Sequence, residues 1–183
     1  MNKPFQNKIF IKDTKIKRAL ISVTDKKGIE VLAKELIALN IQILSTGGTA
    51  RFLHENGIPV KDVSEETRFP EILNGRVKTL HPNIHGGILG RRNNSNHINE
   101  MEKHNIIGID LLITNLYKFK ETIQKTNDDC EIIENIDIGG PAMIRAGAKN
   151  HEFISVITDV DDYPELLSQL KPVSYTHLTL PTT

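Results

Sequence analysis

The sequence has little that would tie the protein to a membrane or to an oxidising compartment. Cys130 is the single cysteine, which excludes an intrachain disulfide and a thiolate metal cluster and fits a reducing compartment. The N-terminus lacks the apolar core of a signal peptide. No run reaches the length of about 18 apolar residues that a membrane-spanning helix needs. We therefore expect a cytoplasmic protein with no membrane partner.

An excess of charge of one sign is also missing. Lys and Arg total 23, and Asp and Glu total 23, so the formal net charge is zero. Without a global positive field the chain has no general attraction for nucleic acid, and any positive potential must be local. We expect a small-molecule partner and no nucleic acid. With 183 residues, 38% of them hydrophobic, the chain is long enough for one well-buried domain.

Residues 1–16 differ from the rest of the sequence. Four lysines (Lys3, Lys8, Lys12 and Lys15) are scattered among polar residues there. Scattered lysines among polar residues at a terminus favour disorder. We predict a flexible leader outside the fold.

Two β-branched runs each end in a turn that could hold an anion. The first, at 19–24, leads to Asp25, which can cap a helix that ends near Asn40. The second, at 41–46, leads through Gly47 and Gly48 into a short helix at 50–55, which Gly57 can end in a left-handed conformation. Free backbone N–H groups where a strand opens onto a helix can bind an anion.

Two further apolar runs, at 109–115 and 153–158, suit strands that are covered on both faces. Between them, Gly139 and Gly140 precede an alanine-rich helix in which Pro141 fits the first position. Alternating strands and helices predict a doubly wound α/β domain with a mainly parallel sheet. Ligands in such folds bind outside the carboxyl ends of the strands.

The segment 90–105 is polar and predicts a surface loop followed by a short helix. Arg91 and Arg92 lie at its start beside asparagines. Two arginines in such a setting need no ligand, so we expect the pair to be solvated.

A basic segment at 75–82 places Arg76, Lys78, Thr79 and His81 close together. With the two glycine turns, these side chains indicate a phosphorylated small-molecule substrate. His81 and His85 have a spacing that can bind zinc from one helical face, but Pro82 lies between them and no carboxylate or cysteine is near. We expect no metal site, and a role for both histidines in ordering the loop that carries Lys78.

Taken in order and at their spacing, six motifs resemble one family. They are Ser22-Val23-Thr24-Asp25-Lys26, Ser45-Thr46-Gly47-Gly48-Thr49-Ala50, Arg76-Val77-Lys78-Thr79-Leu80-His81-Pro82, Asn115-Leu116-Tyr117, Ile136-Asp137-Ile138-Gly139-Gly140 and Ala148-Lys149-Asn150-His151. The family is the IMP (inosine monophosphate) cyclohydrolase domain of the bifunctional purine-biosynthesis protein. The resemblance implies a methylglyoxal synthase-like fold, which is Rossmann-like with three layers. It also implies dehydrative closure of 5-formamidoimidazole-4-carboxamide ribonucleotide to IMP, without a cofactor.

The resemblance covers residues 17–172, which we interpret as a cyclohydrolase domain that is incomplete at its C-terminus. Residues 173–183 match nothing in the family at that point and are interpreted as a non-native tail. In the family a larger C-terminal transformylase domain uses 10-formyltetrahydrofolate as co-substrate, and the full-length parent can form a homodimer. We expect that domain, and its formyltransferase activity, to be absent from these residues.

The resemblance also implies roles for individual residues. Asp137 corresponds to the general base near the attacking amide, and Lys78, Tyr117 and Lys149 to groups that stabilise the oxyanion and protonate the leaving oxygen. Residues implied to bind substrate, mostly its phosphate and ribose, are Ser22, Thr24, Lys26, Thr46, Gly47, Gly48, Thr49, Arg76, Thr79, Asn115, Gly139 and Gly140.

Other interpretations of these residues remain open. Gly47 and Gly48 could only make a turn, Lys149 could be a solvated cation at a helix end, and Tyr117 could be a core ring. Asp137 could cap a helix, a role compatible with catalysis, and Asn115 could close a turn instead of binding the base. At the level of function, the alternatives are a methylglyoxal synthase and a nucleotide-binding regulatory module with the same fold.

Overall fold

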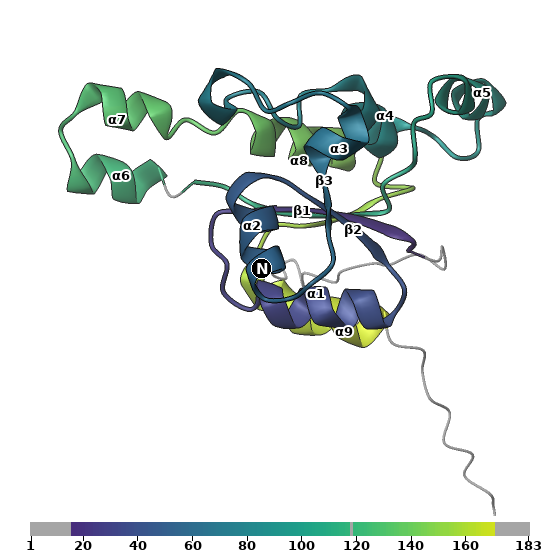
Figure 1. Ribbon diagram of the computed structural model, residues 1–183, viewed down its shortest axis with the longest axis horizontal. Helices are drawn as coiled ribbons and strands as arrows, with labels where there is room; N and C mark the ends of the chain where they lie inside the picture. Colours follow the sequence, from purple (N-terminus) through teal and green to yellow (C-terminus); the bar gives the residue numbers. More distant parts are fainter. Residues whose placement is uncertain (1–15, 118, 171–183) are drawn as a thin grey trace, which may run out of the picture.

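A five-stranded, all-parallel sheet forms the centre of the protein (Figure 1). The structure is a computed structural model that describes residues 16–117 and 119–170. The strands are β1 (Arg18–Val23), β2 (Gln42–Ser45), β3 (Lys61–Asp62), β4 (Leu111–Asn115) and β5 (Ser155–Ile157), in the order β3-β2-β1-β4-β5. The doubly wound α/β fold class predicted from the sequence is confirmed.

Helices cover both faces of this sheet. Figure 1 shows α1 and α9 below the sheet, α4 and α8 above it, and α6 and α7 reaching out to one side. The helices are α1 (Ile29–Ala38), α2 (Gly47–Glu55), α3 (Val63–Thr67), α4 (Pro82–Leu89), α5 (Ser95–Lys103), α6 (Phe119–Lys125), α7 (Asp129–Glu134), α8 (Gly139–Lys149) and α9 (Tyr163–Leu170), with 3₁₀ turns η1 (Leu73–Gly75) and η2 (Val160–Asp162). In the described ranges no helix is both long and apolar enough to cross a bilayer.

Strand β1 contributes to both halves of the core. Ala19, Ile21 and Val23 pack with the apolar faces of α1, α2 and α9, whereas Leu20 packs with α3, α4 and α8. Successive side chains of a strand point to opposite faces, so a strand covered on both sides must be apolar throughout. The result is a three-layer fold.

The strand order fixes where a ligand can bind. Chain connections run from β1 outward through β2 to β3 on one side, and β4 continues on the other side of β1. The direction of winding therefore reverses between β1 and β4, whose last residues, Val23 and Asn115, lie opposite each other. In open α/β sheets the crevice at this switch point is the usual ligand site.

Several local predictions were wrong or misplaced at helix starts. Asp25 does not cap α1. The residue just before that helix is Gly28, in a left-handed conformation, and the Asp25 carboxylate accepts a hydrogen bond from the Lys27 amide. Helix α2 begins at Gly47, before the predicted start at residue 50. Pro141 is the third residue of α8 rather than the first, a position whose N–H has no partner within the helix in any case.

The prediction for the polar segment 90–105 is confirmed only in part. The predicted helix is α5, which begins after Asn94. Arg92, however, is not solvated, because its guanidinium donates to the carbonyl oxygens of Phe153 (3.1 Å) and Ile109 (2.8 Å) and pairs with Asp110. Burial lowers the pKa of Arg92, although the Asp110 charge raises it.

The two predicted terminal segments lie almost entirely outside the described residues. Residues 1–15 of the predicted leader and the whole predicted tail at 173–183 are not among the described residues. Ile16, which the sequence assigns to the leader, is 8% exposed and packs into the core with α1 and α9.

Candidate active site

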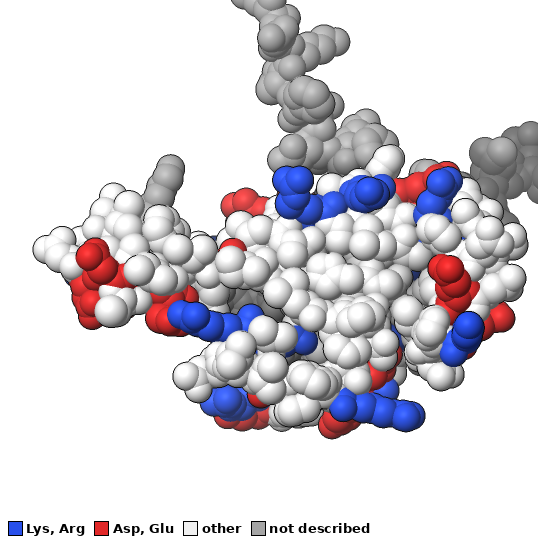
Figure 2. Space-filling view, turned by 90° about the horizontal axis from the view of Figure 1, so that it is seen from above, with Lys and Arg blue, Asp and Glu red and all other residues white. Residues whose placement is uncertain are grey.

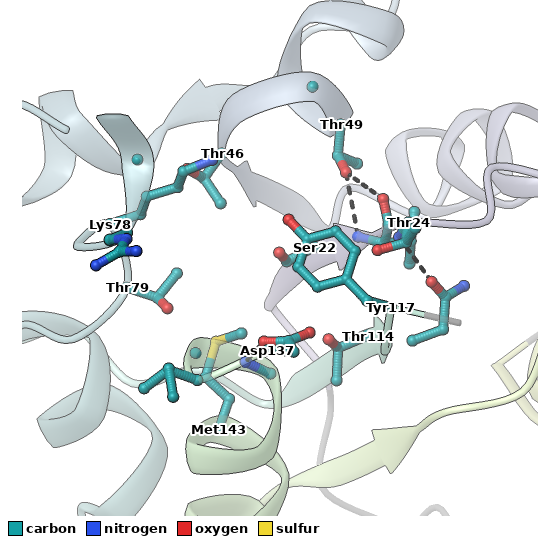
Figure 3. Close-up of a pocket in the computed structure, with 18 of the residues that line it drawn as sticks. Ser22, Thr24, Thr46, Thr49, Lys78, Thr79, Thr114, Tyr117, Asp137 and Met143 are labelled. Atoms are coloured by element: carbon teal, nitrogen blue, oxygen red, sulfur yellow. Dashed lines mark hydrogen bonds between the residues drawn. The ribbon is translucent and has the colours of Figure 1, made fainter. Parts of the chain in front are cut away.

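A cavity of about 530 Å³ opens at the carboxyl ends of β1 and β4 (Figure 3). Cavities that bind metabolites have volumes of about 300–1,000 Å³. The lining contains all the residues that the sequence assigns to the site except Gly47 and Lys149: Ser22, Thr24, Lys26, Thr46, Gly48, Thr49, Arg76, Lys78, Thr79, Asn115, Tyr117, Asp137, Gly139 and Gly140. The structure thus brings together side chains from five separate stretches of the chain.

The turn after β1 is fixed by two polar side chains. Asn115 accepts hydrogen bonds from the amides of Thr24 (2.6 Å) and Asp25 (3.0 Å) and donates to the Asp25 carbonyl (3.0 Å). The hydroxyl of Thr49, which is 4% exposed, accepts from the Val23 amide (3.1 Å) and donates to the Val23 carbonyl (2.9 Å). Because these groups bond the protein itself, both residues position the turn.

The same turn directs polar groups into the cavity. Ser22 and Thr24 present hydroxyls, and the Lys26 ammonium lies 3.5 Å from the Thr24 carbonyl oxygen. These groups are donors of the kind that hold phosphate oxygens. In Figure 3, Thr24 and Thr49 lie on one side of the cavity, and Lys78 and Thr79 on the other.

The N-terminus of α2 forms a second part of the rim. Thr46 precedes the helix in an extended conformation, and Gly47 begins it with φ of +54°. The amide of Gly47 and the hydroxyl of Thr46 both donate to a carboxylate oxygen of Glu71, at 3.1 and 2.5 Å. A helix N-terminus favours negative charge, which here is supplied by Glu71.

Lys78 is held closely between two glycines. A Cβ on Gly47 would lie 2.8 Å from its Nζ, and a Cβ on Gly75 would lie 2.6 Å from its Cε. Both glycines have positive φ, a conformation that other residues rarely adopt. The ammonium of Lys78 is 3.6 Å from Glu71 Oε2. Gly47 therefore shapes the site although it does not line the cavity.

Arg76 lies at the outer edge of the cavity and forms an ion pair with Glu134, at the end of α7. Both side chains are more than half exposed. Their hydrogen bond raises the pKa of Arg76 and lowers that of Glu134. Exposed pairs of this kind are weak, so this one can open readily.

Asp137 lies at the start of α8 and has two roles. Its Oδ1 accepts a hydrogen bond from the Gly140 amide at 2.8 Å, so the helix-cap interpretation is correct, and the residue also lines the cavity. A Cβ on Gly140 would lie 2.8 Å from Asp137 Oδ2 and 2.6 Å from Leu116. Glycine at position 140 thus lets the carboxylate approach the helix end.

Tyr117 is not a core residue. It is 45% exposed, and its ring projects into the cavity, between the Lys78 side and the Thr24 side in the view of Figure 3. Thr79, by contrast, is 5% exposed and lies against Gly139, where a Cβ would come within 3.0 Å of its hydroxyl.

Lys149 is the one predicted catalytic residue that the structure separates from the site. It is exposed and is the last residue of α8, whereas the cavity is at the first turn of that helix. A helix rises 1.5 Å per residue, so the two ends are about 15 Å apart. The solvated-cation interpretation fits this position.

Some residues that line or border the cavity are not predicted from the sequence. Thr114 and Met143, both 1% exposed, form part of its wall. Thr114 follows the last apolar residue of a strand, a signal that could have found it. Glu71 and Glu134 carry no such signal, because each meets its partner through tertiary contacts.

The two histidines at 81 and 85 belong to the start of α4. Pro82 begins that helix, and the His81 Nδ1 accepts from the Asn83 amide at 3.1 Å. Burial lowers the pKa of His85. Among residues 16–117 and 119–170, no group of three or more His, Cys, Asp or Glu is arranged to hold a metal ion.

Comparison with protein families matches residues 28–142 to the model described as "MGS-like domain". The chain belongs to the MGS-like family. Figure 2 shows one face of this MGS-like domain, on which basic and acidic side chains are interspersed over a mainly uncharged surface.

The curated relatives of the MGS-like domain include purine biosynthesis proteins. The bifunctional purine biosynthesis protein PurH of Roseobacter denitrificans is 56% identical over 156 residues, which are 85% of this chain and 30% of that protein. PurH of Bartonella bacilliformis is 57% identical over 157 residues, 86% of this chain and 29% of that protein. The resemblance to this family is confirmed, and the chain spans about 30% of the length of the PurH proteins that it matches.

A solved structure has the same fold. The crystal structure of ForH superposes with a TM-score of 0.77 at 38% sequence identity, and the match covers 84% of this chain and 78% of that chain.

Proposed function

We propose that this MGS-like domain is an IMP cyclohydrolase, which closes 5-formamidoimidazole-4-carboxamide ribonucleotide to IMP with loss of water in purine biosynthesis. One observation carries the proposal. A single cavity contains both a set of phosphate-binding groups and the carboxylate of Asp137, in a chain more than half identical to PurH proteins.

The phosphate of the ribonucleotide binds at the turn after β1 and the start of α2. The hydroxyls of Ser22, Thr24 and Thr46 and the ammonium of Lys26 are its donors, together with the backbone at Gly48. The positive end of the α2 dipole adds to the attraction. Thr49 and Asn115 hold these groups in place.

Ring closure then depends on Asp137. The carboxamide nitrogen of the substrate is a weak nucleophile because its lone pair is delocalised, so removal of its proton during attack assists the step. With Oδ1 held by the Gly140 amide, Oδ2 of Asp137 is the oxygen that takes this proton. Lys78 and Tyr117 donate to the oxyanion that forms on the formyl group.

Loss of water completes the reaction. The nitrogen–carbon bond has formed, and the former formyl oxygen now leaves as water with protons delivered by Lys78 or Tyr117. As its C–O bond breaks, the former formamide nitrogen loses its proton and forms the C=N bond of the new ring. No electrons are transferred between substrate and protein, so the step requires no redox cofactor. Lys149 takes no part in this scheme, because it lies at the far end of α8.

The longer relatives suggest what the rest of such a protein would do. As a bifunctional protein, a PurH parent would also carry AICAR formyltransferase activity, with 10-formyltetrahydrofolate as co-substrate and a homodimeric assembly. We assign that activity to residues outside the cyclohydrolase domain.

The test is turnover of the formylated ribonucleotide by the 183-residue chain, followed through the ultraviolet absorbance of IMP. Asp137→Asn and Lys78→Ala should each lower kcat by about a hundredfold or more, because each removes a proton-transfer or charge-stabilising group. Glu65→Gln is the matched control, since Glu65 is an exposed residue of α3 outside the cavity and should leave kcat unchanged.

The outcome also separates the alternatives. Undiminished IMP formation by both variants would remove these residues from the mechanism. Release of phosphate from dihydroxyacetone phosphate would indicate a methylglyoxal synthase. Retention of nucleotide in calorimetry without turnover would indicate a regulatory binding module.

A further inference from the structure

Glu71 occupies the position of an anion at the start of α2. Its Oε1 accepts hydrogen bonds from the hydroxyl of Thr46 (2.5 Å) and the amide of Gly47 (3.1 Å). Its Oε2 lies 3.6 Å from the ammonium of Lys78. A hydroxyl, a helix N-terminal amide and an ammonium are the groups that bind phosphate oxygens in proteins. A carboxylate of the chain therefore uses donors that a phosphorylated ligand would need.

The segment that carries Glu71 is strained. Leu73, Asn74 and Gly75 all have positive φ, at 54°, 54° and 84°. This region is unfavourable for leucine, because its Cβ crowds the following carbonyl oxygen. Leu73 is also 66% exposed, so burial of its side chain does not compensate for the strain. Strain held at the rim of a cavity is a common property of segments that change conformation when ligand binds.

The other contacts that hold this segment in place are weak. A short antiparallel bridge joins Ile72 and Val77, with hydrogen bonds of 3.2 and 3.4 Å. The Lys78–Glu71 pair has both side chains about one-third exposed. A second carboxylate, that of Asp137, lines the same cavity and accepts its hydrogen bond from the start of α8 instead.

We propose that Glu71 is an internal competitor for the phosphate site. In the ligand-free protein its carboxylate satisfies the donors at the start of α2. A phosphomonoester, which carries more negative charge, displaces the carboxylate from Thr46 and Gly47, and this releases the ammonium of Lys78 from Glu71 for its role at the formyl group. This inference rests on the phosphate site of the proposed function. Only protein molecules in which Glu71 is displaced can bind phosphate. The apparent affinity for phosphate is therefore the intrinsic affinity multiplied by the fraction of molecules in that state.

The first test uses inorganic phosphate and calorimetry on the full 183-residue chain. Glu71→Gln and Glu71→Ala should bind phosphate about tenfold more tightly than the unsubstituted protein, since the competing charge is gone. Glu65→Gln removes one negative charge from the neighbouring helix and should bind phosphate as the unsubstituted protein does. Equal or weaker binding by both Glu71 variants would overturn the proposal, because Glu71 would then only support the loop.

The second test does not depend on a variant. The amide resonance of Gly47 in a ¹⁵N-labelled sample should be among the most strongly shifted when phosphate saturates the protein, because its acceptor changes from carboxylate to phosphate. An unmoved Gly47 resonance at saturation would contradict the exchange.

The tests also separate the two proposals. Tighter phosphate binding by the Glu71 variants without IMP formation would support the competitor role and refute the cyclohydrolase. IMP formation together with unaltered phosphate affinity in the Glu71 variants would support the cyclohydrolase and refute the competitor role. No phosphate binding by any variant would refute the competitor role.

Discussion

The two walls of the cavity are built differently. The β1 wall (residues 22–26, with Thr49 and Asn115) is held by hydrogen bonds between side chains and backbone. The loop wall (residues 68–80) is held by the hydrogen bonds that Glu71 accepts at the start of α2 and by ion pairs between partly exposed side chains, and it contains residues with left-handed backbone. If the proposed function is correct, the preformed β1 wall would fix the phosphate, and the loop wall would bring Lys78 and Arg76 to the ligand after it binds.

The largest expected difference in stability is between two leucine-to-alanine variants, one in each region. Leu20, on the strand that leads to the β1 wall, is fully buried, whereas Leu73 in the loop wall is 66% exposed. Leu20→Ala should lower the free energy of unfolding by about 3 kcal/mol, because it removes buried methylene groups and leaves a cavity. Leu73→Ala should change it by no more than about 0.5 kcal/mol. Urea unfolding measures both, and similar losses would refute the difference between the walls.

A somewhat smaller loss of stability is expected at alkaline pH, from the ionisation of Tyr163. Burial and the charges of Asp25 and Asp159 raise the pKa of Tyr163 to about 12. The ordinary tyrosine pKa is about 10, so the unfolded chain loses this proton first and stability falls between pH about 10 and about 12. Two pKa units correspond to about 2.7 kcal/mol.

Urea unfolding at pH 9 and at pH 11.5 measures this loss. Tyr163→Phe should keep its stability across that interval better than the unsubstituted protein, because it has no hydroxyl to ionise. An equal decline in both proteins would assign the alkaline loss to other groups.

A smaller loss of stability than that of Leu20→Ala should come from substitutions of two glycines. Gly47 and Gly57 both have positive φ, so an alanine at either position should lower the free energy of unfolding by about 1 kcal/mol. A Cβ on Gly57 meets nothing within 4 Å, but one on Gly47 would displace Lys78. Only Gly47→Ala should therefore weaken IMP binding, by about tenfold, as calorimetry can measure. Equal affinities would show that Lys78 does not need its present position.

Much of the fold was predictable because its information is local. A mostly apolar run, such as 109–115, indicates a strand covered on both faces, and β4 is found there. Gly57 ends α2 with φ of +70°, as its position predicts. The grouping of most site residues also follows from the sequence, since strand ends of a parallel sheet meet at one edge.

The errors arose where distant residues decide the outcome. Arg92 is partly buried because it donates to the carbonyl oxygens of Ile109 and Phe153, which its local sequence cannot show. Asp25 bonds its own turn instead of a helix, a choice between two local structures of similar propensity. Lys149 does not line the cavity, because a helix that begins at the site carries its last residue away from it.

The most direct test of the account is a titration of the ¹⁵N-labelled chain with IMP, followed by two-dimensional NMR. We predict that the largest shifts fall on the amides of residues 22–26, 46–49 and 137–140, which surround the cavity. Shifts concentrated on another surface, such as α5, or no shifts at saturating IMP, would contradict the central claim that this cavity binds the nucleotide.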